Sequence, residues 1–156
     1  MSKTISALTV GAASLLMLCL GGQFGVAAEK GTAVAVVQQW RGFNASQEAP
    51  RRVVVKDQKA WEEVWSAMVG YLEPKPEAPK VDFDSQMVIA VFMGRRSTGG
   101  FSIQITGIEL NDKMVVAVKQ SSPPPGAITT QALTSPYHVV VVAKTDKPVE
   151  FVDDKK

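Results

Sequence analysis

Two neighbouring stretches of the sequence decide the fold class: QMVIAVFM at 86–93 and FSIQIT at 101–106. The first is a nearly continuous apolar run, which is typical of a strand buried on both faces. The second alternates apolar with polar side chains at a period of two, as a half-buried strand does. The sequence therefore predicts a β-rich fold that contains one fully buried strand and one half-buried strand.

The residues after position 106 extend the second stretch into a hairpin. Gly107 interrupts the alternation, so we expect a β-bulge there, after which Ile108 and Leu110 resume the pattern. Asn111-Asp112 then makes a tight turn into a strand at 114–119. These two strands are expected to pair.

Further short strands are predicted on both sides of this hairpin, at 33–39, 51–56, 137–144 and 149–152. The polar segment from Trp40 to Pro50 predicts a loop. About seven short strands at close spacing are typical of an antiparallel β-sandwich, roll or barrel. We therefore expect a mainly β (α+β) domain with one helix packed on it.

That helix is predicted at about 58–70. Asp57 suits its N-cap and Gly70 its C-terminal cap. Four apolar side chains recur at helical spacing and line one face: Trp61, Val64, Trp65 and Met68. The favoured interpretation is a helix held on a sheet by its largest side chains. The alternative is a small-ligand or sugar binder that uses Trp61 and Trp65 as a platform.

The first 28 residues predict a cleavable signal peptide. Lys3 supplies the positive end, residues 5–20 form a short apolar run, and Val26-Ala27-Ala28 provides small residues for cleavage after Ala28. The run is shorter than the ~20 residues of a spanning helix. Leu18 precedes Cys19, a poor match to a lipoprotein site, so lipid anchoring at Cys19 is not expected. We expect a periplasmic or secreted protein.

The mature chain from Glu29 would contain no cysteine, so its stability must come from one hydrophobic core. We expect an N-terminal strand and loop at 29–50, a β-rich domain at 51–152 and a frayed tail at 153–156. The formal net charge of +2 falls to +1 without Lys3, and the arginines occur in isolated pairs. This distribution gives little support to nucleic-acid binding. The mature chain also lacks a second apolar span for a membrane.

No sequence motif indicates a catalytic, metal or cofactor site. His138 is the single histidine, lies within a predicted strand and has no metal ligands at suitable spacing. A small envelope enzyme that uses His138 with Asp82 or a serine remains an alternative. Asp82 and Asp84 are more typical of turn and capping groups.

Three loops, at 97–101, 121–126 and 135–137, combine glycines, prolines and aromatic side chains. Stiff loops on a β-scaffold lose little entropy on docking, which suits protein binding, although plain connecting turns explain them equally well. We expect at least one of Gly99 and Gly100 to adopt a positive φ or to allow the close approach of another backbone. The candidate protein-binding residues are Arg95, Arg96, Thr98, Gly99, Gly100, Phe101, Pro124, Pro125, Gly126, Pro136 and Tyr137.

The order of several motifs resembles the C-terminal domain of the protease complex subunit PrcB family. The resemblance covers roughly Arg51 to Val152 and rests on these motifs: Trp61-x-x-x-Trp65, Val81-Asp82-Phe83, Gly94-Arg95, Thr98 to Ile103, Pro123 to Gly126, and Ser135 to Val139. It implies an exported bacterial protein. The founding member of the family is an accessory subunit of a surface protease complex and not the protease, and most relatives have no assigned activity. This sequence departs from relatives that are lipoproteins, because it lacks a good lipidation site.

Two of the loops are also similar to those of chagasin-type protease inhibitors, which present loops from an immunoglobulin-like sandwich: Thr98 to Phe101 and Ser135 to Tyr137. The leading hypothesis is therefore an exported, non-enzymatic protein-binding module that assists or inhibits a protease. Convergence of the three loops on one edge would favour binding. A pocket that places His138 beside a carboxylate or serine would favour an enzyme.

Overall fold

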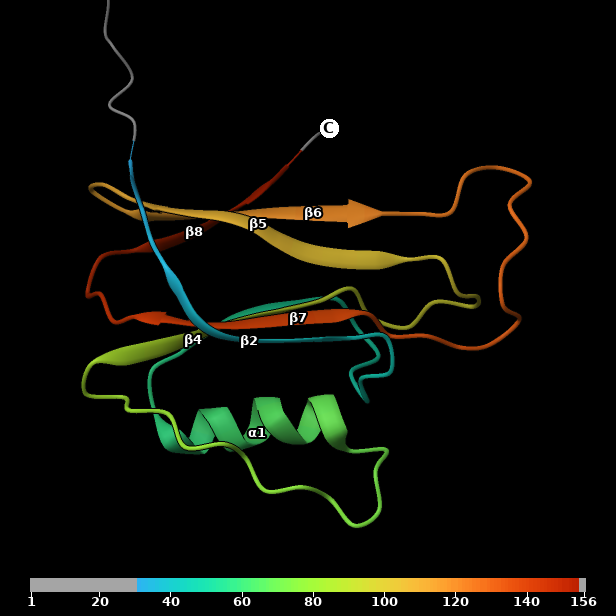
Figure 1. Ribbon diagram of the computed structural model, residues 1–156, viewed down its shortest axis with the longest axis horizontal. Helices are drawn as coiled ribbons and strands as arrows, with labels where there is room; N and C mark the ends of the chain where they lie inside the picture. Colours follow the sequence, from blue (N-terminus) through green and yellow to red (C-terminus); the bar gives the residue numbers. More distant parts are fainter. Residues whose placement is uncertain (1–30, 155–156) are drawn as a thin grey trace, which may run out of the picture.

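Within the described part of the chain, two four-stranded sheets pack face to face, and one helix covers the outer face of the second sheet (Figure 1). The computed structural model describes residues 31–154. The predicted signal peptide at 1–28, with Cys19 and the cleavage site after Ala28, lies outside the described residues. The prediction of a mainly β fold with one packed helix is confirmed.

The first sheet has the strand order β1-β5-β6-β8. Its strands are β1 (Thr32–Ala33), β5 (Ser102–Leu110), β6 (Met114–Ser121) and β8 (Val149–Asp153). The β5–β6 hairpin is confirmed, and its register shifts between Ile105 and Gly107, where the bulge was predicted. β8 pairs parallel with β6, which departs from the antiparallel expectation. The intervening strand β7 lies in the other sheet, so β8 returns in the same direction as β6.

The second sheet has the order β2-β7-β4-β3. Its strands are β2 (Val36–Gly42), β7 (Tyr137–Ala143), β4 (Gln86–Phe92) and β3 (Arg51–Val55). The predicted loop at 40–50 was wrong for its first three residues, which belong to β2. Trp40 pairs there with Val139, and its ring lies 5.3 Å from that of Trp61, so tertiary packing extends the strand.

β4 separates two hydrophobic cores, because its side chains alternate between them. Three of them face the first sheet: Met87, Ile89 and Val91. The other three face the helix: Val88, Ala90 and Phe92. Both sets are almost fully buried, which confirms the prediction of a strand covered on both faces.

The helix α1 (Gln58–Val69) begins and ends close to its predicted bounds. Asp57 is the N-cap, and its Oδ1 accepts a hydrogen bond from the N–H of Ala60 at 2.9 Å. Gly70 is the C-cap but has a right-handed φ of −61°. A side chain there would meet Ser46 Oγ and the Ser66 carbonyl oxygen at 2.7 Å, so glycine allows the close approach of the 43–50 loop.

Candidate functional site

Three loops meet at one end of the sandwich, which we call the loop end: residues 43–50 between β2 and β3, 93–101 between β4 and β5, and 122–136 between β6 and β7 (right side of Figure 1). Gly99 N–H donates to the Thr130 carbonyl at 2.9 Å. Ser135 N–H donates to the Phe43 carbonyl at 2.6 Å. The predicted contact loops therefore converge, and backbone hydrogen bonds join them to the 43–50 loop, which was predicted as a loop but not as part of the contact surface.

Gly100 has a φ of +87°, so the expectation of a positive φ at one of the two glycines is confirmed. A Cβ added there would lie 3.0 Å from the Cβ of Pro123. Glycine thus meets two requirements at this position, a left-handed backbone and the close approach of the proline loop. Gly126 also has a positive φ, of +79°, but a Cβ there would contact nothing.

The predicted contact residues differ in exposure. Five of them are exposed, namely Arg95, Gly100, Pro124, Pro125 and Gly126, whereas Phe101 is half-buried. Pro136 is buried, and its carbonyl accepts a hydrogen bond from Met93 N–H at 2.9 Å. Thr98, Gly99 and Tyr137 are half-buried. A contact role for these residues stays a prediction.

A groove of about 550 Å³ opens at the loop end, and large apolar side chains flank it. Its lining comes from all three loops: Phe43, Asn44, Gly99 to Ser102, Thr130 and Ala132 to Thr134. Phe43 is 58% exposed and Leu133 is 63% exposed. Sequence reasoning missed both, because each stands singly in a polar segment without any periodic pattern.

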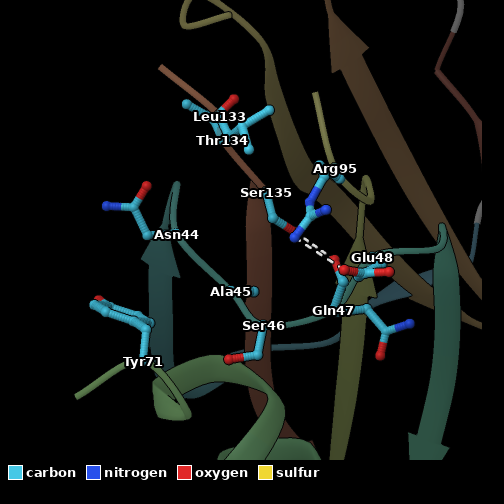
Figure 2. A pocket seen from close by; sticks show the side chains of 10 residues that line it. All are labelled: Asn44, Ala45, Ser46, Gln47, Glu48, Tyr71, Arg95, Leu133, Thr134 and Ser135. Carbon is cyan, nitrogen blue, oxygen red and sulfur yellow. Dashed lines mark hydrogen bonds and ion pairs between the residues drawn. The ribbon is translucent and has the colours of Figure 1, made fainter. Parts of the chain in front are cut away.

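A second hollow of about 270 Å³ adjoins this groove through Asn44, Leu133 and Thr134 (Figure 2). Arg95 and Glu48 form an ion pair across it at 2.9 Å, and Tyr71 reaches it from the segment after α1. Arg95 N–H also donates to the Glu48 carbonyl at 2.8 Å. Arg95 therefore links two of the loops and carries a charge that Glu48 already offsets.

Arg96 is packed between the loops. Its guanidinium carbon lies 5.6 Å from the centre of the Phe101 ring, and its terminal nitrogen donates to the Met93 carbonyl at 3.0 Å. Within residues 31–154 it has no carboxylate partner, and its Nε is buried without a hydrogen bond. The cation–π contact and the carbonyl bond make Arg96 a brace of the 93–101 loop.

His138 has both ring nitrogens engaged between the two sheets. Nδ1 accepts a hydrogen bond from Ile105 N–H at 2.9 Å, which fixes the tautomer, so Nε2–H donates to Gln39 Oε1 at 2.9 Å. Burial, reinforced by the nearby Arg41 cation, lowers the pKa of His138 to about 4. A neutral imidazole with both nitrogens hydrogen-bonded has none to offer a substrate, and within residues 31–154 no carboxylate or serine bonds to it. The geometry does not favour the enzyme alternative.

Asp82 has the predicted role of a turn residue. Its carboxylate accepts hydrogen bonds from Ser85 Oγ at 2.7 Å and from Asp84 N–H at 3.1 Å. The first of these bonds does most to lower the pKa of Asp82. Residues 31–154 contain no cluster of side chains suited to hold a metal ion, and no helix among them is long and apolar enough to cross a membrane.

Comparison with known families finds a match to the family described as PrcB C-terminal. Residues 87–143 match the PrcB C-terminal family. The resemblance inferred from the sequence motifs is thereby confirmed over this segment, although the match is narrower than the predicted 51–152. The similarity to chagasin-type inhibitors is not found. No curated protein matches the chain, and no solved structure matches it.

The matched segment runs from β4 to the end of β7 and includes two of the three loops at the loop end. Trp61 and Trp65 lie outside it. Trp61 is fully buried, and the indole N–H groups of Trp61 and Trp65 donate to the carbonyls of Pro79 and Pro76, each at 2.8 Å. The proline-rich connector thus covers these rings, and Trp61 offers no open face to a sugar.

Proposed function

We propose that this chain is an exported, non-enzymatic protein-binding module that acts as an accessory subunit of a protease complex, and that the loop end is its contact surface. The match of residues 87–143 to the PrcB C-terminal family supports the association with a protease complex. The observation that carries the contact surface is the exposure of Phe43 and Leu133 around one groove.

Physical reasons favour this end of the molecule for binding. Exposed aromatic and aliphatic side chains around a hollow are the anchors that dominate protein interfaces. Here they stand on loops that backbone hydrogen bonds already hold together, such as the Arg96–Thr134 pair at 2.7 and 3.0 Å. Little conformational entropy is lost when such a surface docks, so a larger part of the free energy of its apolar contacts contributes to affinity.

A matched pair of exposed aliphatic residues tests the contact surface. Leu133 is 63% exposed at the loop end, and Val37 is 62% exposed near the start of β2, at the far end of the sandwich. We expect Leu133→Asp and Phe43→Asp to reduce capture of the partner from envelope extract by more than about tenfold, whereas Val37→Asp leaves it unchanged. Thermal denaturation should give similar midpoints for all three variants.

The identity of the captured protein tests the protease assignment. We expect mass spectrometry of the wild-type capture to identify a protease or a subunit of its complex, absent from the Leu133→Asp capture. An equal loss in Val37→Asp would refute the loop end as the contact surface. A captured partner without any protease component would refute the accessory-subunit function.

Peptidase assays distinguish an accessory subunit from an inhibitor. We expect the purified full chain to maintain or raise the peptidase activity of the isolated partner. A fall in activity that follows the amount of added chain, and that Leu133→Asp abolishes, would assign it as an inhibitor.

The mass of the mature protein tests the proposed export and cleavage. We expect protein purified from the envelope or medium to have the mass of a chain that begins at Glu29. A retained segment 1–28, or a lipid on Cys19, would contradict the proposed processing.

A further inference from the structure

The first sheet is one strand short along part of β5. β1 pairs only with Leu110 and Glu109 of β5, and one further backbone bond joins Val34 N–H to the Ile108 carbonyl at 2.8 Å. The chain then leaves for the second sheet as β2. Within residues 31–154, no strand pairs with the outer side of β5 at residues 102–106, which we call the open edge.

The hydrogen-bond pattern gives the direction of the backbone groups at the open edge. Ile105 faces Val118 of β6, but Ile105 N–H donates to His138, and the Val118 carbonyl accepts from Asp154 N–H at 2.8 Å. These two residues are therefore a non-hydrogen-bonded pair of the antiparallel ladder. Two residues away in the same register, the Ile103–Gln120 pair has the same character. The N–H and the carbonyl of Ile103 consequently point outward from β5, where no described group bonds to them.

The position that a further strand would fill lies above β2. Gln39 bonds to the imidazole of His138, and Arg41 pairs directly with His138, so both side chains are on the face of the second sheet that looks toward the first. A hollow of about 250 Å³ lies at this position, lined by Arg41 to Phe43, Ser102 to Gln104, and Pro136 to Tyr137. It adjoins the groove of the loop end, because Phe43 and Ser102 line both.

Arg41 sets the charge of this position. Its side chain is exposed and forms no ion pair with any carboxylate of the described chain. A cation beside unpaired backbone groups complements an extended segment that carries a carboxylate side chain.

We propose that an extended segment of a partner protein, carrying an acidic residue, adds to β5 as a further strand at Ile103 and places its carboxylate against Arg41. The backbone of Ile103 supplies one N–H and one carbonyl for the new ladder, and the hollow receives the side chains that point inward. This inference goes beyond the proposed function, because such a segment need not come from a protease.

A second copy of this chain fits the open edge less well. Two-fold pairing of β5 with β5 around Ile103 would bring two Arg41 cations into the same interface without an acidic partner. Like charges in one interface lower affinity, so the charge pattern favours a segment of a different, acidic protein.

Amide hydrogen exchange of the full chain tests the free edge first. We expect the Ile103 amide to exchange at least about tenfold faster than the Gln104 amide, which bonds to β6. Equal protection of the two amides in the monomer would overturn the proposal.

Synthetic peptides test the occupant. The probes are acetylated heptapeptides of alternating valine and threonine, with one glutamate at each position in turn, and a matched set with lysine. We expect at least one glutamate peptide to bind in fluorescence polarisation, to protect the Ile103 amide, and to bind at least about fivefold more tightly than its lysine counterpart.

Charge reversal supplies the matched variants. Arg41→Glu should weaken the glutamate peptide about tenfold and favour the lysine peptide, whereas Arg51→Glu on β3, an exposed arginine at the opposite edge of the second sheet, should change neither. Three results would overturn the proposal: no peptide bound at millimolar concentration, binding without protection of Ile103, or a dimer in sedimentation whose Ile103 amide is already protected.

Discussion

The two sheets differ in the number of faces that other elements cover. β4 of the second sheet lies between the first sheet and α1, and all its residues from Met87 to Phe92 are buried. β6 of the first sheet is covered on one side only, so buried and partly exposed residues alternate along it. A continuous apolar run therefore indicates a strand covered on both faces, and an alternating run indicates a strand covered on one face.

The largest loss of stability is expected when the side chain that anchors α1 on the second sheet is removed. Trp61 is fully buried against that sheet, so Trp61→Ala should lower the free energy of unfolding by about 3–5 kcal/mol. Trp65 is half-buried at the rim of the same cluster, and Trp65→Ala should cost clearly less. Urea denaturation measures both, and equal midpoints for Trp61→Ala and wild type would mean that the helix does not stabilise the sheet.

The hydrogen bond from Ile105 N–H to His138 joins the two sheets, and the buried histidine should make the free energy of unfolding depend on pH. The pKa of His138 is about 4 in the fold and near 6.5 when unfolded, so between these values the unfolded chain binds more protons. The contribution of His138 to the free energy of unfolding is therefore fully present above pH 6.5. It falls by about 3 kcal/mol as the pH drops to 4. Denaturation across this range should reveal the slope in wild type.

His138→Gln is the control for this slope, because its amide oxygen can still accept the hydrogen bond from Ile105 N–H. The wild-type slope between pH 6.5 and 4 should disappear in the variant. The lowered pKa of Asp82 places its titration below this window in both proteins. An identical slope in the variant would contradict the role of His138.

Valine-to-alanine substitutions compare the two sheets most directly. Val88 and Val91 of β4 are fully buried on opposite faces, so each alanine variant should lose about 2 kcal/mol. In β6, Val116 is fully buried but Val115 is partly exposed on the solvent face. Val116→Ala should cost a similar amount and Val115→Ala less than about 1 kcal/mol. Equal losses at the two β6 positions would contradict the conclusion that β6 is covered on one face only.

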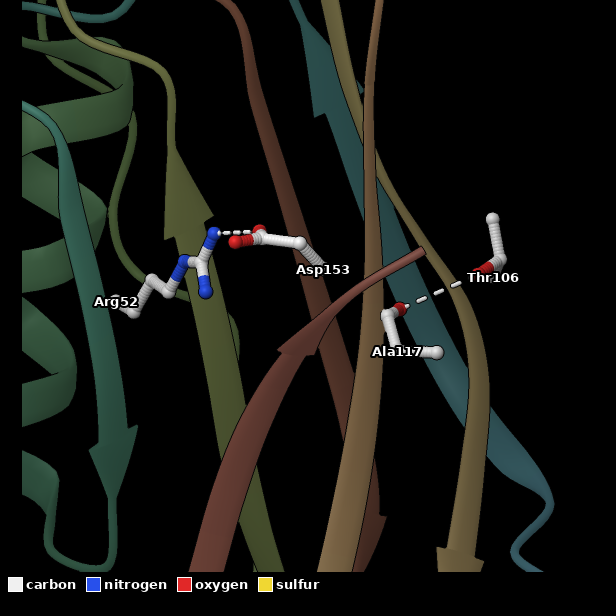
Figure 3. Close-up of polar contacts among 4 residues, drawn as sticks. All are labelled: Arg52, Thr106, Ala117 and Asp153. Atoms are coloured by element: carbon white, nitrogen blue, oxygen red, sulfur yellow. Dashed lines mark hydrogen bonds and ion pairs between the residues drawn. The ribbon is translucent and has the colours of Figure 1, made fainter. Parts of the chain in front are cut away.

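The smallest effect is expected at the edge where the two sheets are joined by charge. Arg52 of β3 forms an ion pair with Asp153 of β8 (Figure 3). Both side chains are partly exposed, so a double-mutant cycle with Arg52→Ala and Asp153→Ala should give a coupling of about 0.2–1 kcal/mol that 1 M salt reduces. A coupling energy above this range that persists in 1 M salt would contradict this expectation and would mean that the ion pair holds the edges of the two sheets together.

Much of the fold could be predicted from local patterns. The buried run of β4, the alternation of β5, the bulge at Gly107 and the stripe of α1 each follow from spacing along the chain. The parallel pairing of β8 could not be predicted, because it depends on which sheet β7 joins. The extension of β2 through Trp40 also depends on a partner distant in sequence, Trp61.

The candidate site was only partly predictable, for the same reason. Glycines and prolines predicted the loops, and the positive φ of Gly100 follows from its residue type. Exposure of Phe43 and Leu133 depends on how three loops meet, which no local pattern records. Pro136 is likewise buried where its carbonyl accepts a hydrogen bond from Met93, a residue distant in sequence.

The position of β1 has a practical consequence for handling the molecule. Thr32 pairs with Leu110 beside the β5–β6 turn, whereas the loop end lies at Ser102, at the opposite end of β5. Nine residues of extended strand place these two points about 30 Å apart. A tag, resin or sensor surface attached on the amino-terminal side of Gly31 would therefore present the loop end outward, which makes this orientation the one to choose for immobilisation.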